Sequence, residues 1–227
     1  MPDESAPGLE NLVNQIAHDV RNHAFTIGLQ AELGQRRSVG SPEVKAHFDS
    51  ILHQVDALRR YLDALLLYGR PVKLSLAEVD PVAVTREKVD ALRFGSAGAA
   101  AAPVRVETGR DVGRVVWDAR AIGYALQALL DNAVLSATPP PEVVVAVRAE
   151  GEQVTIEVRD AGNGIPADVL ARLAVPMAVR RVGSPGLGLA IARKMAQAHG
   201  GRVEIESPGR GTTVRLVLPR NAAPPTV

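Results

Sequence analysis

The sequence of 227 residues contains no cysteine, and aromatic residues make up only 3% of it. The first absence excludes a disulfide framework and any cysteine-ligated zinc site, and it is consistent with a reducing cytosol. Hydrophobic residues nevertheless make up 46% of the chain. The sequence therefore predicts a globular protein whose core is built mainly from Leu, Val, Ile and Ala.

A strong charge of either sign and a long apolar run are also lacking. The formal net charge of +1 gives no electrostatic basis for binding nucleic acid. No stretch approaches the roughly 20 apolar residues that a membrane-spanning helix requires, and Met1–Ser5 does not begin a secretory signal. We expect a cytoplasmic chain without a membrane segment of its own, and the sequence leaves open that it is the cytosolic part of a membrane receptor.

Residues 1–70 carry a helical pattern. Apolar residues recur at steps of three and four from Leu9 to Arg37, which predicts an amphipathic helix. A break at Gly40 and Pro42 precedes a second such pattern over Glu43–Tyr68. Two long helices joined by a short turn predict an antiparallel hairpin. Because a lone hairpin cannot shield both apolar stripes from water, we expect a homodimer in which two hairpins form a four-helix bundle.

The rest of the chain has a different pattern. Residues 71–80 are expected to be a linker, and short strands alternate with helices from 81 to 220. This mixture predicts an α+β sandwich with helices on one face of a mixed sheet. A tail over 221–227 is expected to be disordered. The expected helices span 81–92, 118–136, 167–173 and 187–198, and the expected strands span 104–107, 114–117, 142–149, 153–159, 202–206 and 212–218.

The first motif with chemical content is Asp160-Ala-Gly162-Asn-Gly164, at the end of a predicted strand. A carboxylate there can accept a hydrogen bond from the amino group of a purine, and the glycines let backbone approach a ring or a phosphate. The motif taken alone fits an ordinary tight turn equally well.

Two further motifs have the same ambiguity. The run Gly183-Ser-Pro-Gly186-Leu-Gly188 opens a predicted helix, where free amides and the helix dipole favour an anion, although such runs also form plain loops. Asn132 lies in a predicted helix, and its amide oxygen can be a ligand of Mg²⁺. A lone Asn is more often a surface residue.

In this order, the three motifs resemble the Bergerat-fold ATPases, the superfamily of gyrase, MutL and histidine kinases. The resemblance covers Pro81 to Pro219 and includes Gly200-Gly201 and the strand after Gly211. It implies a site for ATP and Mg²⁺, with Asn132 as the metal ligand. The nucleotide-binding residues that it implies are Asn132, Asp160, Gly162, Gly164, Gly186, Gly188 and Thr212.

The first predicted helix indicates a branch of that superfamily. Its segment Ile16-Ala-His18-Asp-Val-Arg-Asn22 resembles the histidine box of sensor histidine kinases. The resemblance implies that His18 accepts the γ-phosphoryl group, that Asp19 manages the proton on the imidazole, and that the phosphoryl group passes to the Asp of a response regulator. It also implies that Asn22 can place a water that dephosphorylates the regulator.

The chain departs from the family pattern at several positions. Ala128 replaces a frequent Asn, Leu135 replaces a basic residue, and His23 replaces a Pro. The lid segment 173–181 lacks the usual phenylalanines, and Arg180 or Arg181 is a candidate phosphate contact. These departures keep two alternatives open: a phosphotransfer hub with a degenerate nucleotide domain, and a non-catalytic scaffold. In contrast, Ala128 also stands where water-activating relatives carry a Glu base, which favours transfer to a protein nucleophile.

Overall fold

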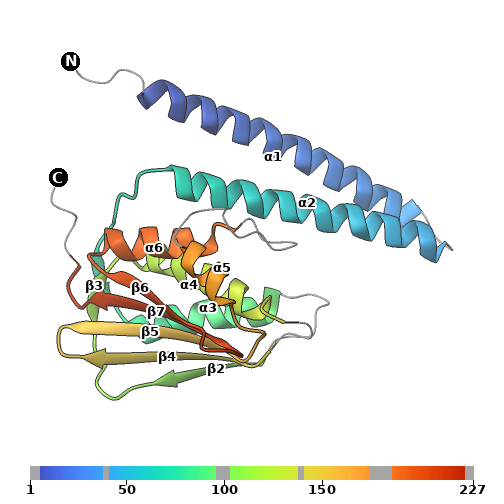
Figure 1. Cartoon of the computed structure of the whole chain (residues 1–227). Coiled ribbons are helices and arrows are strands. Elements are labelled where there is room, and N and C mark those ends of the chain that lie inside the picture. The colour runs from blue at the N-terminus through green and yellow to red at the C-terminus, as the bar shows by residue number, and fades with distance from the viewer. Residues whose placement is uncertain (1–5, 38–40, 96–102, 138–140, 174–185, 223–227) are drawn as a thin grey trace. The chain divides into compact units, whose positions relative to one another are not determined.

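The computed structural model describes residues 6–37, 41–95, 103–137, 141–173 and 186–222. These residues form two compact units, one up to Arg70 and one from Pro71 onward. The first unit is all helical and the second combines helices with two sheets (Figure 1). This confirms the predicted fold class of a helical hairpin followed by an α+β domain.

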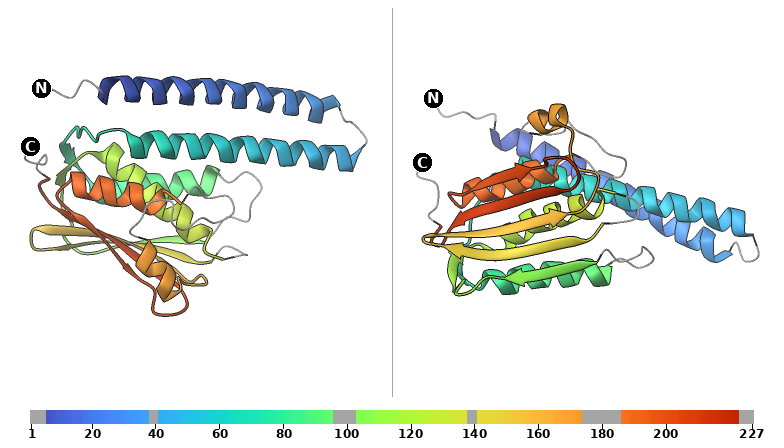
Figure 2. Two further views of the ribbon diagram at one scale, coloured as in Figure 1. Left: turned by 45° about the horizontal axis from the view of Figure 1, so that its top comes forward. Right: turned by 60° about the horizontal axis from the view of Figure 1, so that its bottom comes forward.

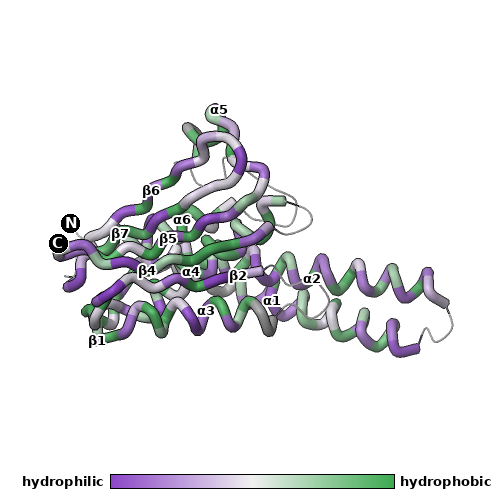
Figure 3. The backbone as a smooth tube through the Cα atoms, turned by 90° about the horizontal axis from the view of Figure 1, so that it is seen from below, coloured by the Kyte–Doolittle hydropathy of each residue, from purple (hydrophilic) through white to green (hydrophobic). Residues whose placement is uncertain are grey.

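The hairpin consists of α1 (Ala6–Arg37) and α2 (Pro42–Gly69). Ser41 caps α2, because its Oγ accepts a hydrogen bond from the Val44 backbone N–H at 3.5 Å, and Pro42 occupies the first turn, where its missing N–H costs nothing. Hydrophobic and hydrophilic residues alternate along both helices at helical spacing (Figure 3). The hairpin is therefore amphipathic, as its sequence predicts.

The two hairpin helices pack against each other along a seam of small residues. Ala17, Ala24 and Ala31, spaced seven apart on α1, are all at most 4% exposed. On the facing helix, Val55 is also buried and lies next to Gly28. Small side chains on one helix let the two backbones come close together, so the large apolar side chains lie mostly elsewhere on the helices.

The second unit contains a five-stranded sheet of order β2-β4-β5-β7-β6, in which β2 and β4 are parallel and the other neighbours antiparallel. A separate pair is formed by β1 and β3. Helices α3, α4 and α6 cover one face of the larger sheet (Figures 1 and 2). The elements are β1 (Ala77–Val79), α3 (Pro81–Gly95), β2 (Val104–Thr108), β3 (Val115–Trp117), α4 (Ala119–Val134), β4 (Val143–Glu150), β5 (Gln153–Asp160), α5 (Ala167–Arg172), α6 (Gly188–Ala198), β6 (Arg202–Glu206) and β7 (Thr212–Pro219).

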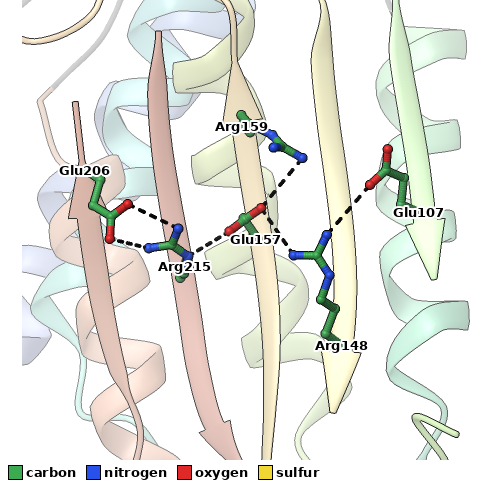
Figure 4. A network of polar contacts seen from close by, with 6 residues as sticks. All are labelled: Glu107, Arg148, Glu157, Arg159, Glu206 and Arg215. Atoms are coloured by element: carbon green, nitrogen blue, oxygen red, sulfur yellow. Dashed lines mark hydrogen bonds and ion pairs between the residues drawn. The ribbon is translucent and has the colours of Figure 1, made fainter. Parts of the chain in front are cut away.

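The two faces of the large sheet differ in chemistry. The face toward the helices is apolar, with Val145, Ile156 and Leu216 at 0% exposure. On the other face, Glu157 is contacted by three arginines, the nearest being Arg215 with Nε 2.7 Å from Glu157 Oε2 (Figure 4). The carboxylates of Glu206 and Glu157 raise the pKa of Arg215. Alternating charges therefore occupy the face opposite α3, α4 and α6.

The structure differs from the sequence prediction mainly at the ends of elements. The expected linker contains β1, whose three residues are too few to show a period of two. In the expected tail, Asn221 forms a bridge with Val116 and Ala222 is buried, whereas residues 223–227 lie outside the described part. Within the described ranges, no helix has the length and apolar character needed to cross a membrane.

Candidate active site

Asp160 is the last residue of β5 and lies on the face of the sheet that the helices cover. It shares this face with Val158, its strand neighbour two residues back, and it is directly opposite Thr212 on β7. The side chain is largely buried, at 8% exposure. Two donors reach its Oδ1 atom: the Gly162 backbone N–H and the Ser136 hydroxyl, both at 2.9 Å. The carboxylate is therefore held in one orientation.

The loop that follows Asp160 needs its glycines for different reasons. A Cβ on Gly162 would overlap the Ser136 hydroxyl, so close packing requires a residue without a side chain. Gly164 has a φ of 75°, which L side chains rarely adopt. The loop is tied to β7 by a hydrogen bond of 2.9 Å that Gly211 N–H donates to the Gly162 carbonyl.

Asn132 and the start of α6 come together on the helical side of the domain. Asn132 lies in the last turn of α4, and a Cβ on Gly188 would lie 3.0 Å from its Nδ2 atom. Gly186, two residues earlier, has a φ of 70°. No side chain among the described residues caps the N-terminus of α6. Its first amides are therefore available to an anion, which the helix dipole also attracts.

These contacts connect the predicted residues into one region. Gly188 lies next to Asn132. One turn after Asn132, Ser136 donates a hydrogen bond to Asp160, which is paired with Thr212 on the neighbouring strand β7. The described residues contain no group of three or more His, Cys, Asp or Glu that could hold a metal ion. A single amide ligand fits Mg²⁺ that arrives with a nucleotide, because this ion is usually held by few protein ligands together with phosphates and waters.

The histidine-box residues form a second cluster on α1. His18 is exposed, with 64% of its side chain accessible, and Asp19 Oδ1 lies 3.4 Å from its Nδ1. The amide Nδ2 of Asn22, one turn later, is 3.2 Å from the same nitrogen. When Nδ1 carries the proton, it pairs with Asp19 and leaves the lone pair of Nε2 free. When Nε2 carries the proton, Nδ1 can instead accept from Asn22.

Helix α1 continues without a break through His23, the position at which the related motif has Pro. The His23 Nδ1–H donates to the Asp19 carbonyl at 2.7 Å. Asn22 is similarly bonded at its carbonyl, by the Thr26 hydroxyl at 3.0 Å. A Pro at this position would remove a backbone donor and kink the helix.

Two polar features of the domain were not predicted from the sequence. Ser136 follows Asn132 by four residues, and this spacing could have indicated that the two share a helix face. The other is a buried pair, in which the Asp118 backbone N–H donates to His199 Nε2 at 3.0 Å and the His199 Nδ1–H donates to the Met195 carbonyl at 2.7 Å. The Asp118 carboxylate also accepts from Ser75 N–H at 2.8 Å, which ties residue 75 to α4.

Burial and backbone hydrogen bonds together set the charge of this pair. For His199, burial lowers the pKa more than the Met195 carbonyl and the Asp118 carboxylate raise it. For Asp118, burial by itself would raise the pKa, but the backbone donors of Ser75, Ala121 and Arg120 together lower it. His199 is therefore neutral and Asp118 is ionised near pH 7.

The departures from the family pattern are only partly visible. Ala128 lies against Gly188, and Leu135 is 53% exposed. The lid residues after Leu173, with Arg180 and Arg181, lie outside the described residues.

Residues 117–222 match the family described as histidine kinase-, DNA gyrase B-, and HSP90-like ATPase. Curated relatives extend the similarity over nearly the whole chain. They include the sensor protein DivL of Caulobacter vibrioides, 28% identical over 94% of this chain and 28% of its own length. The sensor histidine kinase ZraS of Escherichia coli is 26% identical over 96% of this chain and 47% of its own length. The chain thus spans less than half the length of these relatives.

Solved structures agree with this fold. Full-length ShkA in complex with AMPPNP superimposes with a TM-score of 0.74 at 20% identity, covering 94% of this chain and 46% of ShkA. The Acinetobacter baumannii histidine kinase AdeS gives a TM-score of 0.59 at 20% identity, covering 87% of this chain and 95% of AdeS. The chain therefore contains an ATPase domain of this family at residues 117–222, and over nearly its whole length it is similar to sensor proteins that include a sensor histidine kinase.

Proposed function

We propose that this protein binds ATP with Mg²⁺, phosphorylates its own His18 and passes the phosphoryl group to the Asp of a response regulator. The observation that carries the proposal is the assembly of Asn132, Gly188, Asp160 and Thr212 in one region of an ATPase domain. The cluster of His18, Asp19 and Asn22 in the same chain supplies the acceptor.

The adenine and the phosphates would bind at different parts of the domain. Asp160 accepts a hydrogen bond from the exocyclic amino group, and Gly162 and Gly164 allow the backbone to lie close to the nucleotide. The phosphates bind near the uncapped N-terminus of α6, after Gly186 and Gly188. Mg²⁺, when bound, neutralises phosphate charge, and Asn132 is the residue that would hold it.

In the transfer step, His18 attacks through Nε2 while Nδ1 carries its proton. A bond forms between Nε2 and the γ-phosphorus as the bond from that phosphorus to the β–γ bridging oxygen breaks, and ADP leaves. The Asp19 carboxylate, 3.4 Å from Nδ1, stabilises the positive charge that develops on the imidazole. The Nδ1 proton becomes acidic in the phosphorylated product, and Asp19 or water accepts it.

Asn22 is suited to a role in removing the phosphoryl group from the regulator. Its amide lies one helical turn from His18 and is exposed, so it can hold an attacking water beside a phosphorylated regulator docked on α1. We propose that the protein is also a regulator phosphatase. Failure of the unphosphorylated protein to speed dephosphorylation of its regulator would contradict this part.

We further propose that the working form is a homodimer. The hairpin exposes large apolar side chains along α2 that repeat every seven residues, as in helices that pack against a partner helix. The members of this stripe are Val44, Ile51, Leu58 and Leu65, each 37–40% exposed. Two hairpins that share these faces would form a four-helix bundle.

Two phosphoryl donors distinguish the kinase from the alternative of a phosphotransfer hub, which the Ala128 and Leu135 departures keep open. The chain is incubated with γ-labelled ATP and Mg²⁺, and separately with a labelled, phosphorylated regulator. The kinase predicts acid-labile, base-stable label from ATP. Label from the regulator alone would establish the hub, and label from neither would leave only the scaffold.

A further inference from the structure

The Ser136 hydroxyl contacts the carboxylate to which the proposed function assigns the nucleobase. Its Oγ–H donates to Asp160 Oδ1 at 2.9 Å, from the turn that follows α4. The backbone on both sides of this hydroxyl is also fixed: Ser136 N–H donates to the Ala133 carbonyl at 3.2 Å, and the Ser136 carbonyl accepts from Asn163 N–H at 3.3 Å. The hydroxyl is therefore held at a fixed place beside the carboxylate.

The two oxygens of Asp160 have different surroundings. Oδ1 accepts from both Ser136 and Gly162. No donor among the described residues reaches Oδ2. Every fully buried side-chain oxygen of these residues has a hydrogen-bond partner, so Oδ2, which has none, must be accessible to solvent. One carboxylate oxygen is thus used by the protein, and the other is left for a ligand.

This asymmetry matters for the choice of purine. Adenine offers one amino group at C6, which a single acceptor oxygen satisfies. Guanine has a carbonyl at that position, and its N1–H and amino group pair best with both oxygens of a carboxylate at once. A carboxylate with Oδ1 already occupied accepts the adenine amino group and is a poor partner for guanine.

We infer that Ser136 is a specificity-determining residue that positions the Asp160 carboxylate and makes the site select adenine over guanine nucleotides. The packing around it supports this role. A Cβ on Gly162 would overlap the Ser136 hydroxyl, so Gly162 leaves the space that Ser136 uses. Ser136 acts through Asp160, without a required contact to the base itself.

The inference rests on the proposed ATP site, and equilibrium binding separates the two. Affinities for AMPPNP and GMPPNP with Mg²⁺ are measured by calorimetry on the full chain, so that no phosphoryl transfer is needed. Replacing Ser136 by Ala removes one hydrogen bond to a charged group, which predicts AMPPNP binding weakened about 10-fold and a ratio of AMPPNP to GMPPNP affinity reduced about 10-fold. Ser136→Thr retains the hydroxyl and should restore most of the ratio.

Ser75→Ala is the matched control, because Ser75 bonds Asp118 through its backbone N–H, which this substitution keeps. It should leave the ratio unchanged. If the wild type binds AMPPNP and Ser136→Ala has the same ratio of AMPPNP to GMPPNP affinity as the wild type, the role of Ser136 is overturned but the ATP site is not. Equal loss of both nucleotides in Ser136→Ala and Ser136→Thr would also overturn it. A wild-type chain that binds no AMPPNP would overturn both proposals.

Discussion

The hairpin and the α+β domain bury their apolar side chains to different extents. In the domain, Trp117, Ile122 and Leu126 are fully buried, and the exposed large hydrophobic side chains among the described residues are Tyr124 and Leu135. The hairpin exposes many more: Phe25, Ile27, Leu29, Leu33, Val44, Ile51, Leu58 and Leu65. The domain therefore has a core of its own, whereas the hairpin has apolar faces suited to a partner.

The largest effect is expected from a substitution that disables the domain without touching the hairpin. In Asp160→Asn, the amide oxygen is held by Gly162 and Ser136, so the NH₂ group faces the adenine amino group, donor against donor. We expect ATP affinity to fall about 100-fold or more, since a lost hydrogen bond and a repulsive contact combine. Calorimetry with AMPPNP measures this.

The control for Asp160→Asn is Glu152→Gln, in the exposed turn at the other end of β5. It should bind AMPPNP like the wild type. Both variants should keep the oligomeric state of the wild type, since the hairpin is unchanged. Full ATP affinity in Asp160→Asn would contradict the assignment of the base site.

The converse substitution should disable the hairpin without touching the domain. Leu58→Glu places a charge in the exposed apolar stripe of α2, and in a symmetric dimer this occurs twice. Because burying each Leu contributes about 1.5–3 kcal/mol, we expect the dissociation constant of the dimer to rise roughly 100-fold or more. Sedimentation velocity over a concentration series measures the change.

Tyr124→Glu is the matched control in the domain, because Tyr124 is similarly exposed at 44%. It should leave the association unchanged. A monomeric wild type, or a Leu58→Glu variant that dimerises like the wild type, would show that this stripe is not the interface.

A third test concerns the stability of the domain and its pH dependence. His199→Leu leaves the Asp118 N–H and the Met195 carbonyl without partners in a buried site, at a cost of about 2–4 kcal/mol. Burial lowers the pKa of His199 in the folded state below its ordinary value of 6.5. The unfolded state therefore binds the proton first, and stability present above pH 6.5 is lost as the pH falls through the folded pKa.

Trp117 is the single tryptophan of the chain and is fully buried, so its fluorescence reports the unfolding of the domain. Urea titrations at pH 7.5 and 5.5 should show a lower midpoint at pH 5.5 for the wild type. The variant should lose most of this difference. An equal pH dependence in both proteins would show that His199 is not responsible.

The smallest expected effects concern one buried ion-pair network in the domain and one exposed ion pair in the hairpin. Glu157 is buried among three arginines, so Glu157→Gln should destabilise the domain by about 1–2 kcal/mol. In the hairpin, Asp63 pairs with Arg21 at 2.6 Å in an exposed position, and Asp63→Asn should cost less than about 0.5 kcal/mol. Urea unfolding followed by circular dichroism and Trp117 fluorescence measures both, and equal costs would contradict this reasoning.

The elements of the fold follow closely from the sequence, because long apolar periods are local signals. The strand β1 was missed, since three residues show no period. Ala24 and Ile27 are three residues apart in the apolar pattern of α1, and yet they are 1% and 50% exposed. Periodicity identifies an apolar face, but it does not tell which part of that face packs within the hairpin.

Some residues of the site could be predicted from the sequence and others could not, because only some of them belong to local motifs. Asn132, Asp160 and Gly188 belong to motifs whose order carries the information. Ser136 does not, because a single serine after a helix has many possible roles. The bond between Asp118 and His199 joins residues 81 positions apart, and no local pattern indicates such a contact.

In the proposed function two regions share one reaction, because the domain binds ATP and the hairpin accepts its phosphoryl group. The most direct test maps the labelled residue by mass spectrometry, under conditions that preserve phosphohistidine, after incubation with ATP and Mg²⁺. This assignment predicts phosphate on His18 in the wild type, none in His18→Gln, and much slower labelling of His18 in Asp160→Asn at an ATP concentration that does not saturate the variant. Phosphate that persists in His18→Gln, or that reaches His18 in Asp160→Asn at the wild-type rate, would contradict it.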